Sequence, residues 1–96
     1  TRQRKQNTNY PTTITIETLK DKNYTVVAIK TADQHGLLAK ISRIFYKLNL
    51  RIRYAKVNTL ADQVEDYFYI NNDDFSTVTD KATLQNIKDT LQKELA

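Results

Sequence analysis

The sequence predicts an α+β domain in which four antiparallel strands form one sheet and two helices cover one face of it. Three observations lead to this prediction. Segments 13–18 and 24–32 are rich in β-branched residues, which favour strands. Two later segments carry apolar residues at helical spacing. The 96 residues suffice for one small core and are too few for a second.

The first eleven residues, TRQRKQNTNYP, are polar and aperiodic, and they end in the only proline. Such a segment is typical of a linker. We therefore predict a linker or tail at 1–11 and one domain at 12–96. Because the chain begins without Met and within this polar segment, we expect it to be a piece of a longer protein.

Two strands are predicted to follow. Residues 13–18 alternate apolar and polar side chains with period two, which indicates a strand. Residues 24–32 carry apolar residues on both sides, which is typical of a strand at the centre of its sheet. The polar turn at 20–23 is short, so the two strands are expected to form an antiparallel hairpin.

The next stretch, residues 33–38, is a strand-to-helix turn with the sequence DQHGLL and the only glycine, Gly36. A helix start leaves backbone N–H groups without intrahelical partners and carries partial positive charge. The turn is therefore suited to a small anionic ligand. The helix after it ends near Asn49, which tolerates a left-handed cap conformation, and its apolar stripe consists of Leu37, Leu38, Ile41, Ile44, Phe45 and Leu48.

The second half repeats the pattern of strands followed by a helix. Residues 50–60 are predicted to form a strand whose apolar positions change parity at Ala55 and Val57, which indicates a β-bulge or a twist. After a hairpin turn, a further strand places Glu65, Tyr67 and Tyr69 on one face and its alternate residues, Val64, Asp66, Phe68 and Ile70, on the other. Residues 80–95 form a second amphipathic helix, capped by Thr79 or Asp80.

The order strand, strand, helix, strand, strand, helix contains the core of the ferredoxin-like arrangement without its last strand. The first strand can take that place at the sheet edge. Right-handed crossovers then put both helices on one face. The other face is expected to carry Tyr67 and Tyr69, with Val27 and Ile29 or their neighbours, and to meet another domain or another copy.

Composition excludes several classes of function. Without cysteine there is neither a disulfide nor a cysteine metal site, which fits a reducing compartment. No apolar run is long enough to span a membrane, so we expect a soluble, cytoplasmic protein without membrane contact. The only histidine, His35, lies in a turn, and neither Glu65-Asp66 nor Asp73-Asp74 is placed as a catalytic carboxylate pair. We predict no catalytic residue and no metal site.

The net charge of +4 raises the alternative of RNA binding through a tyrosine platform. Tyr67 and Tyr69 have suitable spacing, and Arg51 and Arg53 are close in sequence. However, the aromatic residues follow Glu65-Asp66 instead of a basic residue and a glycine. Two acidic residues there would repel phosphates, so we do not expect nucleic acid as a partner.

The turn 33–38 and its flanks resemble the ACT domain family of small-molecule-sensing regulatory modules, whose turn reads Asp, two variable residues, Gly, Leu, Leu. The longer segment DQHGLLAKISRIFYKLNLRIRYAKVNTLADQVEDYFYI, residues 33–70, is similar to the C-terminal ACT domains of bacterial PII uridylyltransferase/uridylyl-removing enzymes. The resemblance covers residues 12–95. It implies a ferredoxin-like ACT fold.

The sequence departs from the family pattern in three turns. His35 stands where the family usually has proline, so the ligand turn is less rigid here. Asn49 stands near a usual glycine, and residues 61–63 replace a Gly-Glu-Arg-like turn. We expect the Asn and Asp residues of these two turns to tolerate the change.

The resemblance implies a regulatory domain that senses an amino acid, namely glutamine, for an enzyme that controls nitrogen assimilation. The parent enzyme uridylylates the PII protein when glutamine is scarce and removes the groups when it is plentiful. Its catalytic domains, with Mg²⁺, lie outside this chain, so the chain itself is expected to be neither an enzyme nor a binder of cofactors. The alternative is a dimerisation or domain-docking module without a ligand.

For the ligand site, N–H groups near Gly36 are suited to an α-carboxylate and Asp33 to an α-amino group. Alternatively, Asp33 caps the helix and Gly36 only supplies a positive φ. ACT domains usually bind ligand between two copies, so strand 50–60 of a partner copy is expected to contribute Lys56 and Asn58, which are otherwise solvent-facing. The predicted ligand residues are Asp33, Gln34, His35, Gly36, Leu37, Leu38, Lys56 and Asn58, and the predicted interface residues are Tyr54, Tyr67 and Tyr69.

Overall fold

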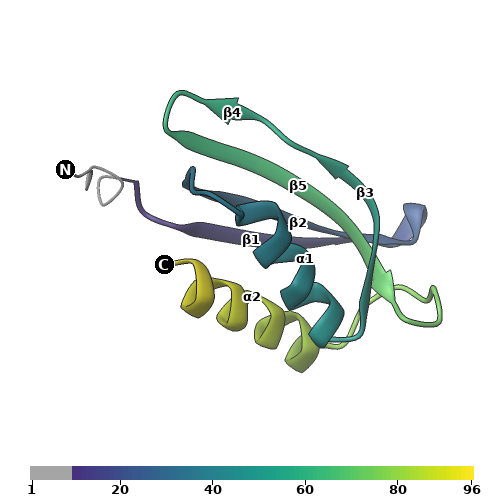
Figure 1. Ribbon diagram of the computed structural model, residues 1–96. Helices are drawn as coiled ribbons and strands as arrows, with labels where there is room; N and C mark the ends of the chain where they lie inside the picture. The colour runs from purple at the N-terminus through teal and green to yellow at the C-terminus, as the bar shows by residue number, and fades with distance from the viewer. Residues whose placement is uncertain (1–9) are drawn as a thin grey trace.

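The computed structural model describes residues 10–96, so most of the predicted linker at 1–11 lies outside the described residues. Eight elements follow one another along the chain (Figure 1). They are β1 (Thr13–Leu19), the 3₁₀ turn η2 (Lys20–Lys22), β2 (Tyr24–Ala32), α1 (Leu37–Lys47), β3 (Leu50–Lys56), β4 (Thr59–Leu60), β5 (Gln63–Asn72) and α2 (Lys81–Leu95).

The strands form one antiparallel sheet in the order β1-β2-β5-β3, and the short β4 also pairs with β5. Both helices lie on the same face of this sheet (Figure 1). β1 pairs with β2 along its whole length and occupies the edge where a ferredoxin-like fold has its last strand. The structure therefore confirms the predicted α+β, ferredoxin-like architecture, with β2 as a central strand.

The hydrophobic core lies between the sheet and the two helices. On β5 the alternate residues beginning with Val64 face the helices, as predicted, and Phe68 packs edge-on against Phe45 of α1 with ring centroids 5.5 Å apart. Val27 and Ile29 are fully buried in this core. It is their neighbours Val26 and Ala28 that pair with Tyr69 and Tyr67 on the other face.

The helix stripes are confirmed with one exception. Ile41, Ile44 and Phe45 of α1 are buried, but Leu38 is 45% exposed. Leu38 was expected to widen the buried stripe; instead it lies in the first turn of α1, where it lines a surface cavity. In α2 the cap is Asp80, whose Oδ2 accepts a hydrogen bond from the Thr83 N–H at 3.0 Å.

The turns are closed by residues with positive φ. Asn49 has φ 61° just after α1, as its sequence position predicts. In the β4–β5 turn, however, the left-handed residue is Ala61, with φ 58°, and not Asp62. The expectation that an Asp would absorb this turn was therefore wrong, and an alanine holds a conformation that costs about 1–2 kcal/mol.

The predicted strand at 50–60 is bulged and then broken. Its register shifts between Ile52 and Tyr54, which places a bulge at Arg53 and decides between the predicted bulge and twist. After the bulge, Lys56 of β3 lies opposite Tyr67, and Thr59 of β4 lies opposite Val64. The register with β5 is therefore the same on both sides of the break between β3 and β4. After the bulge, alternation directs Ala55, Val57 and Thr59 to the helix side.

Phe45 offers a direct test of this core. Because its ring is fully buried against Phe68, we expect Phe45→Ala to lower the free energy of unfolding by about 3–5 kcal/mol. Urea denaturation followed by circular dichroism measures this change. The control is Tyr46→Ala on the next residue, which is 81% exposed and should lower stability far less. Equal losses in the two variants would contradict the assignment of the buried face of α1.

Candidate functional site

A cavity of about 240 Å³ lies between the 33–38 turn and the β4–β5 hairpin. The turn and the start of α1 contribute one wall, with Asp33, Gln34, Gly36, Leu37, Leu38 and Ala39. The sheet contributes the other wall, with Val57, Thr59, Val64 and Asp66. Five of the eight predicted ligand residues thus line one cavity.

Gly36 is the N-cap residue of α1 and has φ +75°. A Cβ atom there would meet nothing within 4 Å, so the glycine is required for its backbone conformation and not for close packing. Among the described residues no side chain caps this helix start. The α1 N-terminus therefore keeps backbone donors available at the cavity wall.

Asp33 joins the turn to the β4–β5 hairpin. Its backbone N–H donates to the Asp62 carbonyl at 2.7 Å, and its side chain lines the cavity. Asp33 does not cap α1, which was the alternative role for this residue. The N-cap residue is Gly36, and no side chain forms a capping hydrogen bond at this helix start. The Asp33 carboxylate is exposed and available to a ligand.

Asp66 is the residue at this site that sequence reasoning missed. It is 1% exposed, on the helix side of β5. Its Oδ1 accepts a hydrogen bond from the Asn58 N–H at 3.2 Å, and its Oδ2 has no partner among the described residues. Burial raises the pKa of the Asp66 carboxyl, the Asn58 N–H opposes this rise, and the charge of Asp33 adds to it.

The same hydrogen bond explains the break between β3 and β4. The Glu65 N–H donates to the Asn58 carbonyl at 2.9 Å, as in a regular ladder. The Asn58 N–H instead bonds to the Asp66 side chain. One ladder bond is thus replaced by a carboxylate, and the strand is interrupted beside the cavity.

Three predicted ligand residues do not line this cavity. His35 is exposed in the turn. Lys56 lies opposite Tyr67, on the face of the sheet that no helix covers. Asn58 contacts Asp66 through its backbone N–H and not through its side chain. Their predicted contribution from a partner copy stays a prediction.

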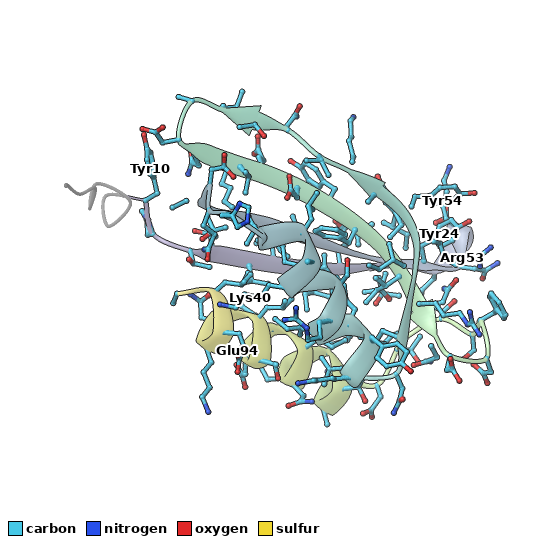
Figure 2. The ribbon with its side chains drawn as sticks, viewed as in Figure 1. Tyr10, Tyr24, Lys40, Arg53, Tyr54 and Glu94 are labelled. Carbon is cyan, nitrogen blue, oxygen red and sulfur yellow. The ribbon has the colours of Figure 1, made fainter. Side chains whose placement is uncertain are left out.

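The predicted interface residues all lie on the helix-free face of the sheet. Tyr54 and Tyr69 form an edge-to-face cluster with Tyr24, with ring centroids 5.5–6.3 Å apart. The Arg53 guanidinium lies 6.0 Å from the Tyr24 ring and donates to Asn71 Oδ1 at 3.0 Å. Figure 2 shows Tyr24, Tyr54 and Arg53 together at the opposite end of the sheet from Tyr10.

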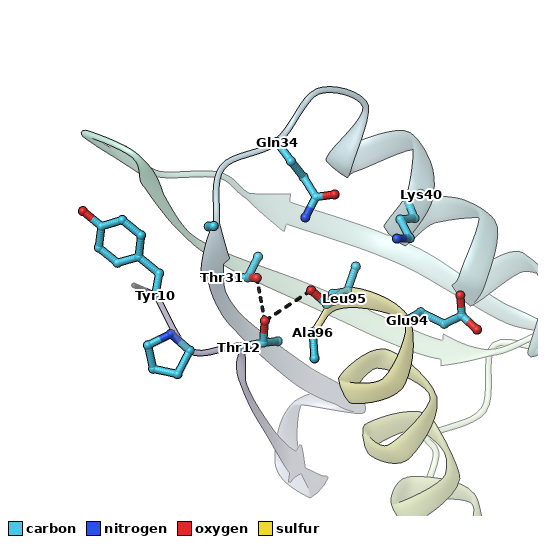
Figure 3. Close-up of a pocket in the computed structure, with 10 residues that line it drawn as sticks. Tyr10, Thr12, Thr31, Gln34, Lys40, Glu94, Leu95 and Ala96 are labelled. Carbon is cyan, nitrogen blue, oxygen red and sulfur yellow. Dashed lines mark hydrogen bonds between the residues drawn. The ribbon is translucent and has the colours of Figure 1, made fainter. Parts of the chain in front are cut away.

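A larger cavity, of about 470 Å³, lies where residues 10–12 meet the end of α2 (Figure 3). Its two threonine hydroxyl groups are already paired. Thr12 Oγ1 and Thr31 Oγ1 are 2.8 Å apart, and Thr12 Oγ1 also donates to the Leu95 carbonyl at 3.3 Å. Figure 3 shows Gln34 and Lys40 at its margin. The smaller cavity has the stronger claim as a site because its buried acceptor is unpaired.

Within residues 10–96 there is no group of three or more metal-ligating side chains that could hold a metal ion. None of the helices in this part of the chain is long and apolar enough to cross a membrane.

Comparison with known families now assigns the fold. Residues 13–96 match the family model described as "ACR9-like, ACT-like domain". The chain belongs to the ACT-like domain family. This match confirms the resemblance that the DQHGLL turn indicates.

The chain is similar to part of several bacterial enzymes. It is 32% identical over 87 residues to the bifunctional uridylyltransferase/uridylyl-removing enzyme of Pseudomonas putida (strain W619). The matched segment covers 91% of this chain and 10% of that enzyme. The enzyme of the same name from Pseudomonas syringae pv. syringae (strain B728a) is 31% identical over 83 residues, 86% of this chain and 9% of the relative. The ACT-like chain therefore spans about a tenth of the curated relatives it matches. No solved structure matches it.

The buried carboxyl predicts an unusual dependence of stability on pH. The pKa of Asp66 is raised in the folded state above its ordinary value of 3.8. Its contribution to stability is therefore greatest below that value and is lost as pH rises through the folded-state pKa. Asn does not ionise, so we expect the free energy of unfolding of Asp66→Asn to increase relative to that of the unmodified chain as pH rises through this pKa. At higher pH the difference between the two should stay constant.

Urea denaturation from acid to neutral pH measures this difference. Glu65→Gln is the control, because Glu65 lies on the other face of β5, 3.7 Å from Lys30 Nζ. The free energies of unfolding of Asp66→Asn and of the unmodified chain should differ by an amount that depends on pH. A difference that is the same at every pH would contradict the assignment of Asp66 as a buried carboxyl.

Proposed function

We propose that this chain is a regulatory ACT domain that senses an amino acid, with glutamine as its ligand. The observation that carries the proposal is the cavity itself. It combines an uncapped helix start at Gly36 with two carboxylates, Asp33 and Asp66, in a space of about 240 Å³. Backbone donors at the start of α1, together with carboxylates from the turn and from β5, suit the two charges of an α-amino acid.

The size of the cavity supports a small ligand. Pockets for drug-sized molecules occupy roughly 300–1,000 Å³, so a cavity of about 240 Å³ suits a molecule of amino-acid size. In the proposed pose the α-carboxylate accepts from N–H groups at the start of α1. The α-ammonium group lies towards Asp33.

We further propose that the domain belongs to a bifunctional uridylyltransferase/uridylyl-removing enzyme, in the cytoplasm, that acts on the PII protein. Support comes from the relatives of that name, in which the matched segment is about a tenth of the length. In this proposal catalysis and its Mg²⁺ reside in other domains of the parent. Glutamine binding here would change the balance between the two activities and so control nitrogen assimilation.

Titration calorimetry with a panel of amino acids tests ligand binding, and a variant on the cavity wall localises it. Thr59 lines the cavity, so we expect Thr59→Arg to fill it, place a cation near the two carboxylates and weaken glutamine binding by more than about tenfold.

Leu60→Arg adds the same side chain at the next residue of β4, which does not line this cavity. We expect it to change the affinity less than about twofold. Heat of binding that Thr59→Arg leaves unchanged would place the ligand elsewhere, and no heat with any amino acid would contradict the proposed function.

A second candidate function is a dimerisation or docking module, and the tyrosine cluster favours it. Tyr54 is 58% exposed although it packs against two other aromatic rings. Exposed aromatic residues on an uncovered sheet face are typical of protein contact surfaces. In this proposal a second ACT copy, in tandem or as a homodimer, covers that face.

Sedimentation velocity at several concentrations tests this second function. If two copies meet through the sheet face, we expect the unmodified chain to sediment as a dimer and Tyr54→Asp as a monomer, because the new charge would be buried without a partner. Tyr46→Asp is the control, since Tyr46 lies on α1, in the layer opposite this face. A monomer at every concentration would contradict dimerisation of this chain.

A further inference from the structure

Asp66 stands apart from the other buried polar residues of the domain. Within residues 10–96 four polar side chains are buried: Thr25, Thr31, Asp66 and Asn71. Thr25 donates to the Val78 carbonyl at 3.0 Å, and Thr31 is paired with Thr12 at 2.8 Å. Asn71 donates to the Asn23 carbonyl at 2.7 Å and accepts from Arg53. Only Asp66 keeps an oxygen without a partner in this part of the chain.

The domain supplies no cation to this carboxylate. The two ion pairs of the described residues are Lys30–Glu65 and Arg51–Asp73, and neither includes Asp66. The charged group that acts on it is another acid, Asp33, which lines the same cavity. A buried charge without a partner destabilises a fold, so two acids around one cavity favour a ligand that brings positive charge.

We propose that Asp66 Oδ2 binds the α-ammonium group of the ligand together with Asp33, so that the cavity selects 2-amino acids over analogues that lack this group. The proposal rests on the amino-acid-sensing function proposed above and names the residue that determines its ligand class. Asp33 provides an exposed acceptor and Asp66 a buried one. An ammonium group has three donors and can serve both.

The pose leaves the existing contacts of Asp66 in place. Oδ1 continues to accept from the Asn58 N–H, so only Oδ2 changes its surroundings. Oδ2 is covered by protein atoms, and the ligand must therefore displace part of the wall. That wall includes Val57, which is 46% exposed and lies at the break between β3 and β4, where the ladder lacks a bond.

Selectivity follows from the cost of an unpaired buried group. A site built to hydrogen-bond a substrate group discriminates strongly against an analogue without it, because its own polar atom then stays unpaired. Glutaramic acid is glutamine without the α-amino group and keeps both the carboxylate and the side-chain amide. We expect the unmodified chain to bind it at least about tenfold more weakly than glutamine.

The experiment compares glutamine and glutaramic acid by titration calorimetry on the unmodified 96-residue chain, Asp66→Asn and Glu65→Gln. Asp66→Asn keeps an oxygen for the Asn58 N–H but turns an N–H₂ group towards the ammonium. We expect it to weaken glutamine binding by at least about tenfold and to leave glutaramic acid unchanged within about twofold. Glu65→Gln removes the same charge from the next residue, on the other face, and should bind both ligands as the unmodified chain does.

Thermal melting by circular dichroism confirms that each variant is folded. If Asp66→Asn does not fold, equal binding of glutamine and glutaramic acid by the unmodified chain still overturns the proposal. Equal affinity for glutamine and glutaramic acid, or glutamine binding that Asp66→Asn leaves intact, overturns the role of Asp66 and leaves amino-acid sensing standing. Absence of binding by any amino acid to the unmodified chain overturns both proposals.

Discussion

The antiparallel pairing of β2 with β5 positions the turn and the buried carboxylate of the candidate site. Its register runs from Thr25 opposite Ile70 to Ala32 opposite Gln63. β2 leads directly into the DQHGLL turn, and β5 carries Asp66 opposite Ile29. The 2.7 Å bond from the Asp33 N–H to the Asp62 carbonyl continues this contact beyond the last strand pair. The turn and the buried carboxylate are thus held against each other by backbone pairing at the centre of the sheet.

Local patterns in the sequence predicted most of this frame because each reflects one dominant force. Period-two alternation placed Val64 and Phe68 on the buried face, and helical spacing placed Ile41 and Phe45. The change of parity at Ala55 and Val57 predicted a bulge or a twist in this strand, and the structure places a bulge at Arg53. In each case burial of apolar surface decides the conformation, and burial of this kind is visible in the order of residue types.

The remainder depended on interactions that residue order does not encode. Leu38 fits the apolar stripe of α1, yet it is exposed and lines the cavity, whereas Leu37 beside it is buried in the core. Ala61 takes a left-handed conformation that its side chain disfavours, because the adjoining strands fix the turn. The alternation of β5 did place Asp66 among apolar residues. An acid at an inward position was the signal of a site, but its unpaired oxygen becomes evident only in three dimensions.

The edge formed by β3 and β4 separates the two candidate surfaces of the domain. Successive residues of this segment face opposite sides of the sheet. Tyr54 therefore joins the tyrosine cluster on the helix-free face, whereas Val57 and Thr59 line the cavity on the helix side. Basic residues, a bulge and a break also make this edge a poor template for pairing with another strand. A second copy is therefore better accommodated on the tyrosine face than along the edge. In the proposals above, ligand binding and assembly use different side chains of the segment from β3 to β4, so a substitution can test one without removing the other.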